Sequence, residues 1–450
     1  MVDVALLRSR VSGPVLTRDD PGFADEVKSW LLNSTHSPEV VVGVTSAEDV
    51  VEAVKFAIAA ELPVRVQATG HAAEVPITDG LLITTRRLDS LTVDEKTHLA
   101  TIGAGLEWER VVAASTPLGL MPIVGSSSTV GAVGFLLGGG CGPLACSHGF
   151  GSDWVRGFQL VTGDGELVRA NAEENTDLFW ALRGGKGGFG VVTEVTIELA
   201  ELPELYGGSL TFDAPDIDAA LHAWVGYLDT ADPRVSTSVA ITRVPDLPFI
   251  PEIVRGHTLL AVRFAFPGSA AEGERLAAPL RAAAPVYIDA LAEMDPALMD
   301  TIHGDPKEPA AGWVAGHMLS DLDEELADTI LGFAGAGKDF PFVALEMRHL
   351  GLATETDVPG GSAVSGRSAK ATLSVFGAPN QELWKTVVPE AARALYGAVG
   401  KWIDAENNIN FAPVPTSREE YEAIWPKHIF DRLQTVRAKY DPRGTFVYGF

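Results

Sequence analysis

The sequence is poor in cysteine, and this shortage excludes a disulfide framework. Its 450 residues include only two cysteines, Cys141 and Cys146, both in one glycine-rich segment. Such a loop seldom offers the Cβ directions that a disulfide needs, and no second Cys/His cluster stands at metal-ligand spacing. We therefore expect two unpaired thiols, no metal site and a reducing, cytoplasmic location.

Positive charge and long apolar runs are scarce as well. There are 34 basic and 60 acidic residues, so the formal net charge is −26. Nucleic acids and anionic membranes select basic patches, so we expect neither as a partner. No stretch approaches the ~20 apolar residues of a membrane span, and Met1 to Arg8 lacks the apolar core of a signal peptide. The sequence carries no signal for an oligomeric state.

The first two hundred residues show strands and helices without a regular βαβ repeat. Hydrophobic content is 46%, and 450 residues exceed what one core usually supports, so we expect two domains. Ser46 is placed to cap a helix that begins in an acidic turn. Residues 191–199 alternate between apolar and polar and predict a strand. Shorter strands are predicted at 40–44, 64–67, 81–84 and 100–103, a helix at 177–183, and a helix and loop over 1–37.

The composition and pattern of the sequence change after Pro203. Alanine-rich helical stretches at 219–228 and 270–284 alternate with strand-like runs at 258–264 and 342–347. We interpret this region as a second domain, built on a sheet with helices over one face. Residues 358–366 are crowded with Pro, Gly and Ser and predict a flexible loop on it. The terminal stretch from Tyr421 is predicted to begin with a helix.

Two glycine-containing loops carry the strongest chemical signal. One is the turn Ala68-Thr69-Gly70-His71, and the other begins at Gly125-Ser126-Ser127-Ser128 and stays dense in glycine as far as Gly142. Backbone N–H groups can approach an anion closely where no Cβ intervenes, so two such loops can cradle a diphosphate. The lone histidine, His71, then lies where an imidazole nitrogen could meet the reactive end of a cofactor.

A third glycine-rich stretch matches the dinucleotide fingerprint G-x-G-x-x-G at 185–190. That fingerprint should follow a strand and open a helix. Here the order is inverted, because a predicted helix precedes the stretch and a predicted strand follows it. We therefore reject a Rossmann interpretation.

Together with segments 177–185 and 188–194, these motifs resemble the FAD-linked oxidases of the vanillyl-alcohol-oxidase type, which have a PCMH-type FAD-binding domain. Within that superfamily the nearest likeness is to the berberine-bridge-enzyme-like and 6-hydroxynicotine-oxidase-like enzymes. The resemblance covers residues 38–200 and the C-terminal end. It implies an α+β fold, with a two-part FAD-binding domain at 1–205 completed by 412–450. The substrate domain, with an antiparallel sheet covered by helices, is then at 206–411.

The resemblance also implies the cofactor site. His71 occupies the position that attaches FAD through its 8α-methyl carbon, a bond that retains the flavin and raises its oxidising power. Many relatives add a second bond from a cysteine, but Ser127 stands at that place, so we expect a single link. The expected cofactor-binding residues are His71, Gln67, Ala68, Thr69, Gly70, Ser127, Ser128, Thr129, Gly131, Gly134, Gly139, Gly140, Gly142, Gly190, Val191 and Val192.

The catalytic residues are less visible. Glu346 and Arg348 share one face of a predicted strand. The alternative to a catalytic role is that they form an exposed ion pair. The resembled enzymes often have a tyrosine two residues before the asparagine that matches Asn410, but this chain has Asn408 there. They often have a histidine at the place of Phe135. Tyr448 could supply a phenol instead, so the expected catalytic residues are Tyr448, Glu346, Asn408 and Asn410.

The function that the resemblance implies is removal of a hydride from a C–H bond next to oxygen or nitrogen. The substrate would be a small organic or natural-product molecule, and O2 would be the acceptor. One alternative is a flavin enzyme that uses another acceptor or performs an oxidative cyclisation. An alternative of another class is a flavin-binding partner protein without catalysis, which the missing tyrosine favours.

Overall fold

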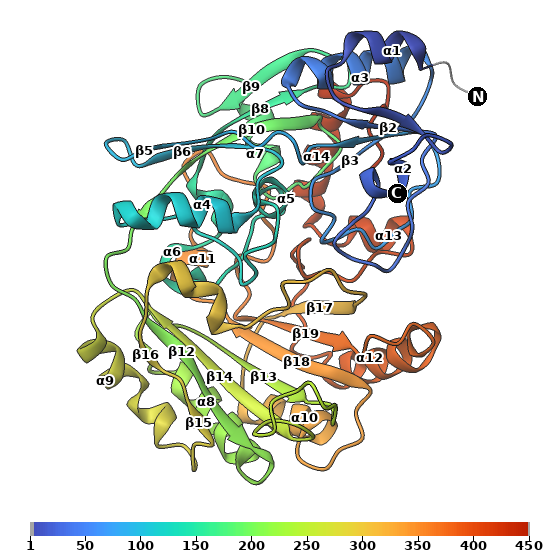
Figure 1. Cartoon of the computed structure of the whole chain (residues 1–450). Coiled ribbons are helices and arrows are strands. Elements are labelled where there is room, and N and C mark those ends of the chain that lie inside the picture. The colour runs from blue at the N-terminus through green and yellow to red at the C-terminus, as the bar shows by residue number, and fades with distance from the viewer. Residues whose placement is uncertain (1–3, 449–450) are drawn as a thin grey trace.

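The chain folds into two lobes (Figure 1), each with a large hydrophobic core. The computed structural model describes residues 4–448. One core gathers apolar residues mainly from the N-terminal part and from 421–440, together with Ala265, Met299, Ile302 and Ala363, and the other gathers residues between 206 and 402. We refer to residues 4–205 with 412–448 as the first lobe and to residues 206–411 as the second lobe.

The first lobe contains three sheets. A four-stranded sheet has the order β1-β2-β4-β3, a five-stranded antiparallel sheet has the order β5-β6-β10-β8-β9, and β7 pairs with β11. The strands are β1 (Val15–Thr17), β2 (Val40–Gly43), β3 (Val64–Gln67), β4 (Leu81–Thr84), β5 (Leu91–Asp94), β6 (Leu99–Gly103), β7 (Leu120–Met121), β8 (Val155–Val161), β9 (Leu167–Asn171), β10 (Val191–Glu198) and β11 (Ala200–Glu201).

Helices pack on these sheets where their sequences have apolar faces. In α3 the side chain of Ser46 accepts a hydrogen bond from the Asp49 amide, as predicted, and Val50, Val54 and Ala57 are buried. The helices of this lobe are α1 (Ala5–Arg10), α2 (Phe23–Glu26), α3 (Ala47–Ala59), α4 (Trp108–Ser115), α5 (Ala132–Leu137), α6 (Ala145–His148), α7 (Thr176–Leu182), α13 (Arg418–Glu422) and α14 (Lys427–Tyr440).

The second lobe is built on one eight-stranded antiparallel sheet. Its main order is β15-β12-β14-β13-β18-β19-β17, and β16 also pairs with β12. The strands are β12 (Tyr206–Asp213), β13 (Ser236–Arg243), β14 (Thr258–Phe266), β15 (Ile288–Asp289), β16 (Ala292–Glu293), β17 (Trp313–Leu319), β18 (Phe342–His349) and β19 (Ala371–Gly377). The helices are α8 (Ile217–Leu228), α9 (Ala270–Arg281), α10 (Glu324–Ala334), α11 (Leu352–Glu355) and α12 (Val387–Ala398), and the 3-10 helix η4 spans Pro296–Ile302.

The two faces of this sheet differ in chemistry. One face buries residues such as Val239, Leu345 and Leu373 in the second core, together with residues of α8, α9, α10 and α12. The alternate residues turn toward the first lobe, where Ser236 Oγ accepts a hydrogen bond from the Cys146 amide. The predicted α+β architecture, with helices over one face of an antiparallel sheet, is confirmed.

The C-terminal end of the chain returns to the first lobe. Val64 in β3 forms a bridge with Phe446, and its amide donates to the Thr445 carbonyl at 2.8 Å. The aromatic side chains of Tyr421, Trp425 and Phe430 enter the first core. Residues far apart in the sequence therefore build one body, as the predicted two-part domain requires.

The loop at 358–366 differs from its sequence-based prediction. Ser362 and Ala363 are buried, the Ala363 amide donates to the Arg183 carbonyl, and the Arg183 guanidinium donates to the Gly361 carbonyl. Gly184, with φ +109°, lies against Val364 so closely that a Cβ would stand 2.4 Å from the Val364 amide nitrogen. Small residues permit close docking against the first lobe here, so the expectation of a flexible loop is wrong.

Candidate FAD-binding and catalytic site

The two predicted cofactor loops lie side by side in the first lobe. The turn after β3 is held by backbone bonds from Trp30 to the Thr69 carbonyl and from Leu31 to the Gly70 carbonyl. Gly70 has φ +79°, a conformation that glycine adopts without strain. A Cβ on Gly131, in the second loop, would stand 3.5 Å from the Thr69 side chain.

The side chains of the two loops form a short polar chain. His71 Nε2 lies 2.9 Å from Thr129 Oγ1, which lies 3.2 Å from Ser127 Oγ. The imidazole stacks on the Trp30 indole with ring centroids 4.0 Å apart. Burial lowers the pKa of His71 to about 4, so the ring is neutral and one of its nitrogens keeps a nucleophilic lone pair at neutral pH.

The backbone of these loops has unpaired donors. Across residues 4–448, the amides of Thr69, Gly70 and His71 donate no hydrogen bond to the protein, and neither do those of Ser127, Ser128 and Thr129. Unpaired amides in two neighbouring loops can bind an anion such as a diphosphate. The donor set of this structure therefore fits FAD, with phosphate oxygens at the amides and a neutral imidazole nearby.

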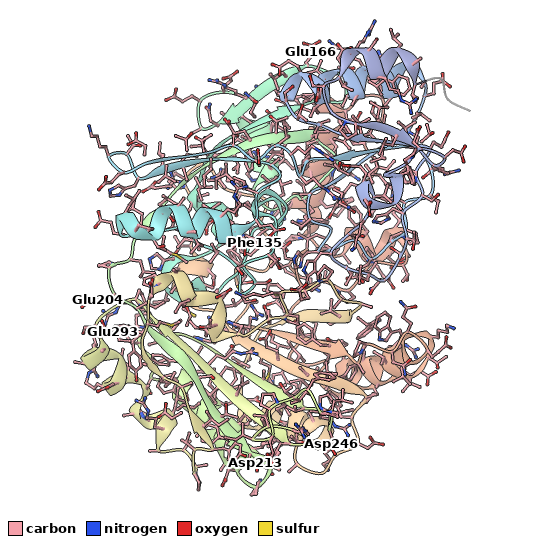
Figure 2. All side chains as sticks on the ribbon, viewed as in Figure 1. Phe135, Glu166, Glu204, Asp213, Asp246 and Glu293 are labelled. Atoms are coloured by element: carbon pink, nitrogen blue, oxygen red, sulfur yellow. The ribbon has the colours of Figure 1, made fainter. Side chains whose placement is uncertain are left out.

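Predicted residues from the C-terminal part meet the glycine-rich stretch after the second loop. Asn410 Nδ2 donates to the Phe135 carbonyl at 3.2 Å, and a Cβ on Gly138 would stand 2.0 Å from Asn410 Oδ1. Asn408 is buried, donates to the Ser365 carbonyl, and accepts a hydrogen bond from the Asn410 amide. Figure 2 shows Phe135 in the first lobe on the side that faces the second lobe.

Lys186 joins this region without having been expected there. Its ammonium donates to the Gly134 carbonyl at 2.9 Å and to Asn410 Oδ1 at 2.8 Å. Burial lowers the pKa of Lys186 to about 8. Its backbone has φ +64°, which is uncommon for a lysine. The sequence offered no reason to select Lys186, because its unusual backbone φ is known only from the structure.

Glu346 and Arg348 lie on the face of the second-lobe sheet that turns toward the first lobe. Glu346 is 4% exposed, and its carboxylate accepts from Arg348 Nε at 2.7 Å and from Arg263 Nη1. Burial alone would raise the pKa of Glu346, but the two guanidinium charges outweigh burial and lower it. The pair is therefore not the exposed ion pair of the alternative interpretation.

Ser126 links this charged face to the second cofactor loop. Both Nη atoms of Arg348 lie 3.3 Å from Ser126 Oγ, which donates to Asp305 Oδ2 at 2.6 Å. The neighbouring Ser128 donates to Asp300 at 2.7 Å. The 3-10 helix η4 and the segment after it thus bring carboxylates of the second lobe against the loop that carries Ser127 and Thr129.

Tyr448 lies on a different wall. A Cβ on Gly187 would stand 2.6 Å from the Tyr448 ring, and the ring is 6.2 Å from that of Tyr421. Burial raises the pKa of Tyr448, so its phenol holds its proton. Tyr448 belongs to the surroundings of the first lobe, whereas Glu346 belongs to the second lobe.

The remaining predicted residues pack or form hydrogen bonds within the first lobe. The helix α7 precedes the 185–190 stretch and the strand β10 follows it, so the order is the inverse of a Rossmann turn. Gly190 has φ +157° and lies against the Val161 carbonyl, and Val191 and Val192 are buried in β10. Gln67 donates to the Lys28 carbonyl at 3.1 Å.

Three side chains near Glu346 or Arg348 were not expected from the sequence: Arg263 in β14, and His303 and Asp305 after η4. Arg263 donates to the His303 carbonyl at 3.3 Å as well as to Glu346. None of the three belongs to a motif, because their neighbourhood is created by strand pairing and by the path of one long connection.

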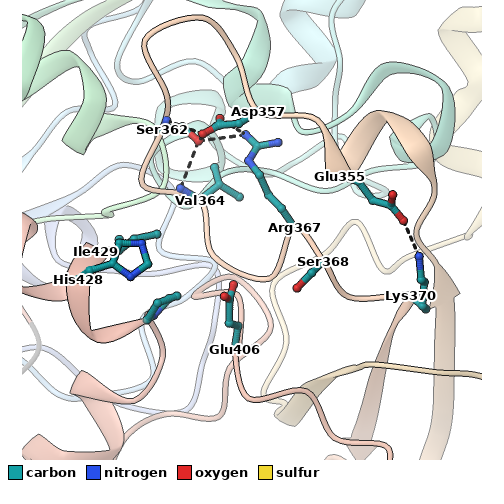
Figure 3. A pocket seen from close by; sticks show the side chains of 11 residues that line it. Glu355, Asp357, Ser362, Val364, Arg367, Ser368, Lys370, Glu406, His428 and Ile429 are labelled. Atoms are coloured by element: carbon teal, nitrogen blue, oxygen red, sulfur yellow. Dashed lines mark hydrogen bonds and ion pairs between the residues drawn. The ribbon is translucent and has the colours of Figure 1, made fainter.

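A cavity of about 460 Å³ opens beside the docked loop (Figure 3). Ion pairs line it, with Arg367 3.2 Å from Asp357 and Lys370 2.6 Å from Glu355. Glu406 and His428 complete its polar lining. The expected catalytic and cofactor residues lie outside this lining.

Cys141 and Cys146 are free and buried. Within the described part of the chain there is no group of three or more His, Cys, Asp or Glu placed to hold a metal ion. Between residues 4 and 448, no helix combines the length and the apolar content needed to cross a membrane.

The sequence matches an FAD binding domain over residues 38–171. It is 31% identical over 247 residues to (R)-6-hydroxynicotine oxidase of Paenarthrobacter nicotinovorans, an alignment that covers 53% of this chain and 54% of that protein. The chain spans about half the length of the curated relatives that it matches.

Solved structures share the whole fold. Physcomitrella patens BBE-like 1 superposes with a TM-score of 0.86 at 16% identity, covering 100% of this chain and 98% of that one. Glucooligosaccharide oxidase from Acremonium strictum, described with a 6-S-cysteinyl, 8α-N1-histidyl FAD, gives a TM-score of 0.81 at 20% identity, covering 98% of each chain.

Fold and loop geometry together define a protein with a PCMH-type FAD-binding domain. These findings support the superfamily of PCMH-type FAD-linked oxidases, and FAD is the cofactor. The superfamily predicted from the sequence is confirmed.

Proposed function

We propose that this chain is an FAD-dependent oxidase that removes a hydride from a C–H bond next to oxygen or nitrogen, with O2 as the acceptor. The observation that carries the proposal is the pairing of two surfaces. Unpaired amides and the neutral His71 lie on the first lobe, and Ser126 joins them to the buried charged face around Glu346.

The first lobe would hold the cofactor. The amides at 69–71 and 127–129 bind the diphosphate, and the His71 imidazole forms the single covalent link. FAD, when bound, supplies the two-electron acceptor. We propose the division into a cofactor domain at 1–205 with 412–450 and a substrate domain at 206–411, which the two separate cores support.

The substrate would be a small molecule bound between the lobes. Glu346, Tyr448, Asn408 and Asn410 are the proposed catalytic residues. Asn408 and Asn410 have no ionisable side chain, so they orient groups and do not accept a proton. The glycines and hydroxyls of the cofactor loops are poor bases, so the proton acceptor must come from another wall of the site.

A flavin-binding protein without catalysis is the second candidate. The observation that favours it is Asn408, which is buried, hydrogen-bonded and unable to act as a phenolate base. A flavin enzyme with another acceptor, or one that performs an oxidative cyclisation, is the third.

One experiment separates these functions. The purified yellow protein is mixed anaerobically with alcohols, sugars and cyclic amines, and the visible absorbance of the flavin is followed. We expect at least one donor to bleach it, and O2 to restore the colour with release of hydrogen peroxide. If the flavin is bleached but only another acceptor restores its colour, that acceptor replaces O2 in the proposal. If none of the tested donors bleaches the flavin, the result favours a flavin-binding protein without catalysis.

A further inference from the structure

His303 is an unusual buried histidine on the second lobe. Its side chain is 5% exposed, and neither ring nitrogen has a hydrogen-bond partner among residues 4–448. Buried polar atoms are almost always hydrogen-bonded, so an imidazole with two orphaned nitrogens calls for a ligand. The segment that carries it is fixed in place, because Arg263 binds its carbonyl oxygen and Ser126 binds Asp305.

The charges around the ring keep it neutral. Burial and the guanidinium groups of Arg348 and Arg263 lower the pKa of His303 well below its usual value. Glu346 Oε1 lies 4.0 Å from His303 Nε2, and the remaining charged neighbour in this cluster, Asp305, is bound through Ser126. A neutral imidazole can accept a hydrogen bond or a proton, which the two arginines cannot do.

Two orphaned hydroxyls lie on the same face of the sheet. Ser238 is paired in register with both Arg263 and Arg348, and Arg348 is paired in register with Thr372. Residues paired in this way point to the same side of a sheet. The hydroxyls of Ser238 and Thr372 are buried without a partner among the described residues, as His303 is.

The other candidate bases are worse placed. Both carboxylate oxygens of Glu346 are already engaged by the guanidinium groups of Arg263 and Arg348, so they are less free to bind a substrate proton. The Tyr448 phenol is buried in the first lobe and holds its proton. Of these three candidates, all within residues 4–448, His303 alone combines burial on the second-lobe face with an unpaired acceptor nitrogen.

We propose that His303 is the proton acceptor of the reaction: its imidazole binds the O–H or N–H group of the substrate and takes up that proton, while Glu346 positions the ring. This inference rests on the proposed oxidase function. It also assigns Ser238 and Thr372 to binding the polar part of the substrate that adjoins the reacting group.

The proton step is balanced within the site. The O–H or N–H bond of the substrate breaks, a bond forms between the proton and a ring nitrogen of His303, and the electron pair stays on oxygen or nitrogen. The imidazolium then faces the Glu346 carboxylate, which offsets its charge. A weak base suffices because the proton becomes more acidic as the adjacent C–H bond breaks.

The test compares histidine variants of the holoenzyme by anaerobic flavin reduction with the donors found above. His303→Asn and His303→Gln should slow reduction by roughly 10²–10⁴-fold, the usual effect of losing a general base. His317→Asn is the matched control. His317 is half-buried against the Tyr396 ring and pairs in register with Leu373, on the helix-covered side of the sheet. Its reduction rate should stay within twofold of the parent.

Other readouts separate a chemical role from a structural one. Because His303 is neutral, the wild-type reduction rate should be level from pH 6 to 7, with no fall near 6.5. Nuclear magnetic resonance of ¹⁵N-labelled histidine should show an unprotonated His303 ring at pH 7, and Glu346→Gln should shift its signals. In Glu346→Gln, reduction should slow while the substrate concentration at half-saturation stays within threefold.

The outcomes keep this inference and the proposed function apart. If the wild type is bleached and both His303 variants, with full FAD content, reduce within threefold of it, the inference is overturned and the oxidase function stands. A loss confined to Tyr448→Phe overturns it as well. If no donor bleaches the wild type, the proposed function fails, and a His303 ring protonated at pH 7 then overturns the inference independently.

Discussion

At the scale of single residues, the first-lobe side of the site is a chain of three side chains. His71, Thr129 and Ser127 follow one another at 2.9 and 3.2 Å. Their neighbour Ser128 points elsewhere, to Asp300 of the second lobe. The side chains of the adjacent residues Ser127 and Ser128 therefore have different hydrogen-bond partners, and this difference can be tested.

Ser127→Cys should form a second covalent bond to the flavin. Its side chain would stand next to Thr129, within reach of a ring attached at His71. Mass spectrometry of digested holoprotein should find FAD joined to peptides from both loops.

Ser128→Cys is the matched control, because position 128 is turned toward Asp300. It should yield FAD joined to the His71 peptide alone. A cross-link at 128 and none at 127 would show that the second loop approaches the flavin in a different register.

The residues found from the sequence are those whose role depends on local backbone form. His71 and the serines at 127 and 128 lie in glycine-containing loops whose spacing the sequence displays, whereas Asn410 was predicted from the resemblance alone. His303, Arg263 and Lys186 could not be found in this way. Their surroundings arise from strand register, from a long connection and from burial, which a linear pattern does not contain.

At the scale of elements, α3 shows how a buried carboxylate fixes a helix N-terminus. Asp49 is 3% exposed and accepts from the amides of Ser12, Gly13 and Thr45 and from the Thr45 hydroxyl. Burial would raise the pKa of Asp49, but these hydrogen bonds outweigh it and lower the value. The ionised form is therefore the one that stabilises the fold.

Asp49→Asn should lower the free energy of unfolding by roughly 2–3 kcal/mol at pH 7, since hydrogen bonds to a charged group are replaced by an amide that also presents donors. Urea denaturation measures it. Because the folded pKa is lowered, the wild-type advantage is present above the unfolded pKa of Asp49. It is lost as the pH falls through the folded pKa.

Glu52→Gln on the same helix is the control. Its ion pair with Arg10 is exposed, so the change should stay within about 0.5 kcal/mol. Equal losses for Asp49→Asn and Glu52→Gln would contradict the role given to the buried carboxylate.

Elements were predicted well where the pattern is long. The helix α3 and the strand β10 follow the sequence closely, since a cap and clear periodicity define them. The strand β1 spans only Val15–Thr17 and was missed within the predicted helix and loop. The prediction of a flexible loop at 358–366 was wrong, because small residues are found in close-packed loops as well as in flexible ones.

At the scale of the whole molecule, one segment of the second lobe ties the lobes together. Asp300 and Asp305 bind Ser128 and Ser126, and Asn33 exchanges hydrogen bonds with Gly312. These contacts place the cofactor loops opposite the polar face of the second-lobe sheet. The resemblance to FAD-linked oxidases predicted the two-domain architecture. It did not predict which segment of the second lobe contacts the first lobe.

The central claim is that FAD is held by the two loops of the first lobe and attached at His71. The most direct test is to precipitate the purified protein with acid, digest it and identify the flavin-bearing peptide by mass spectrometry. We expect the yellow colour in the pellet, FAD on a single peptide containing His71, and release of the colour to the supernatant in His71→Ala. Colour that stays bound after His71→Ala, or FAD on a different peptide, would contradict the account.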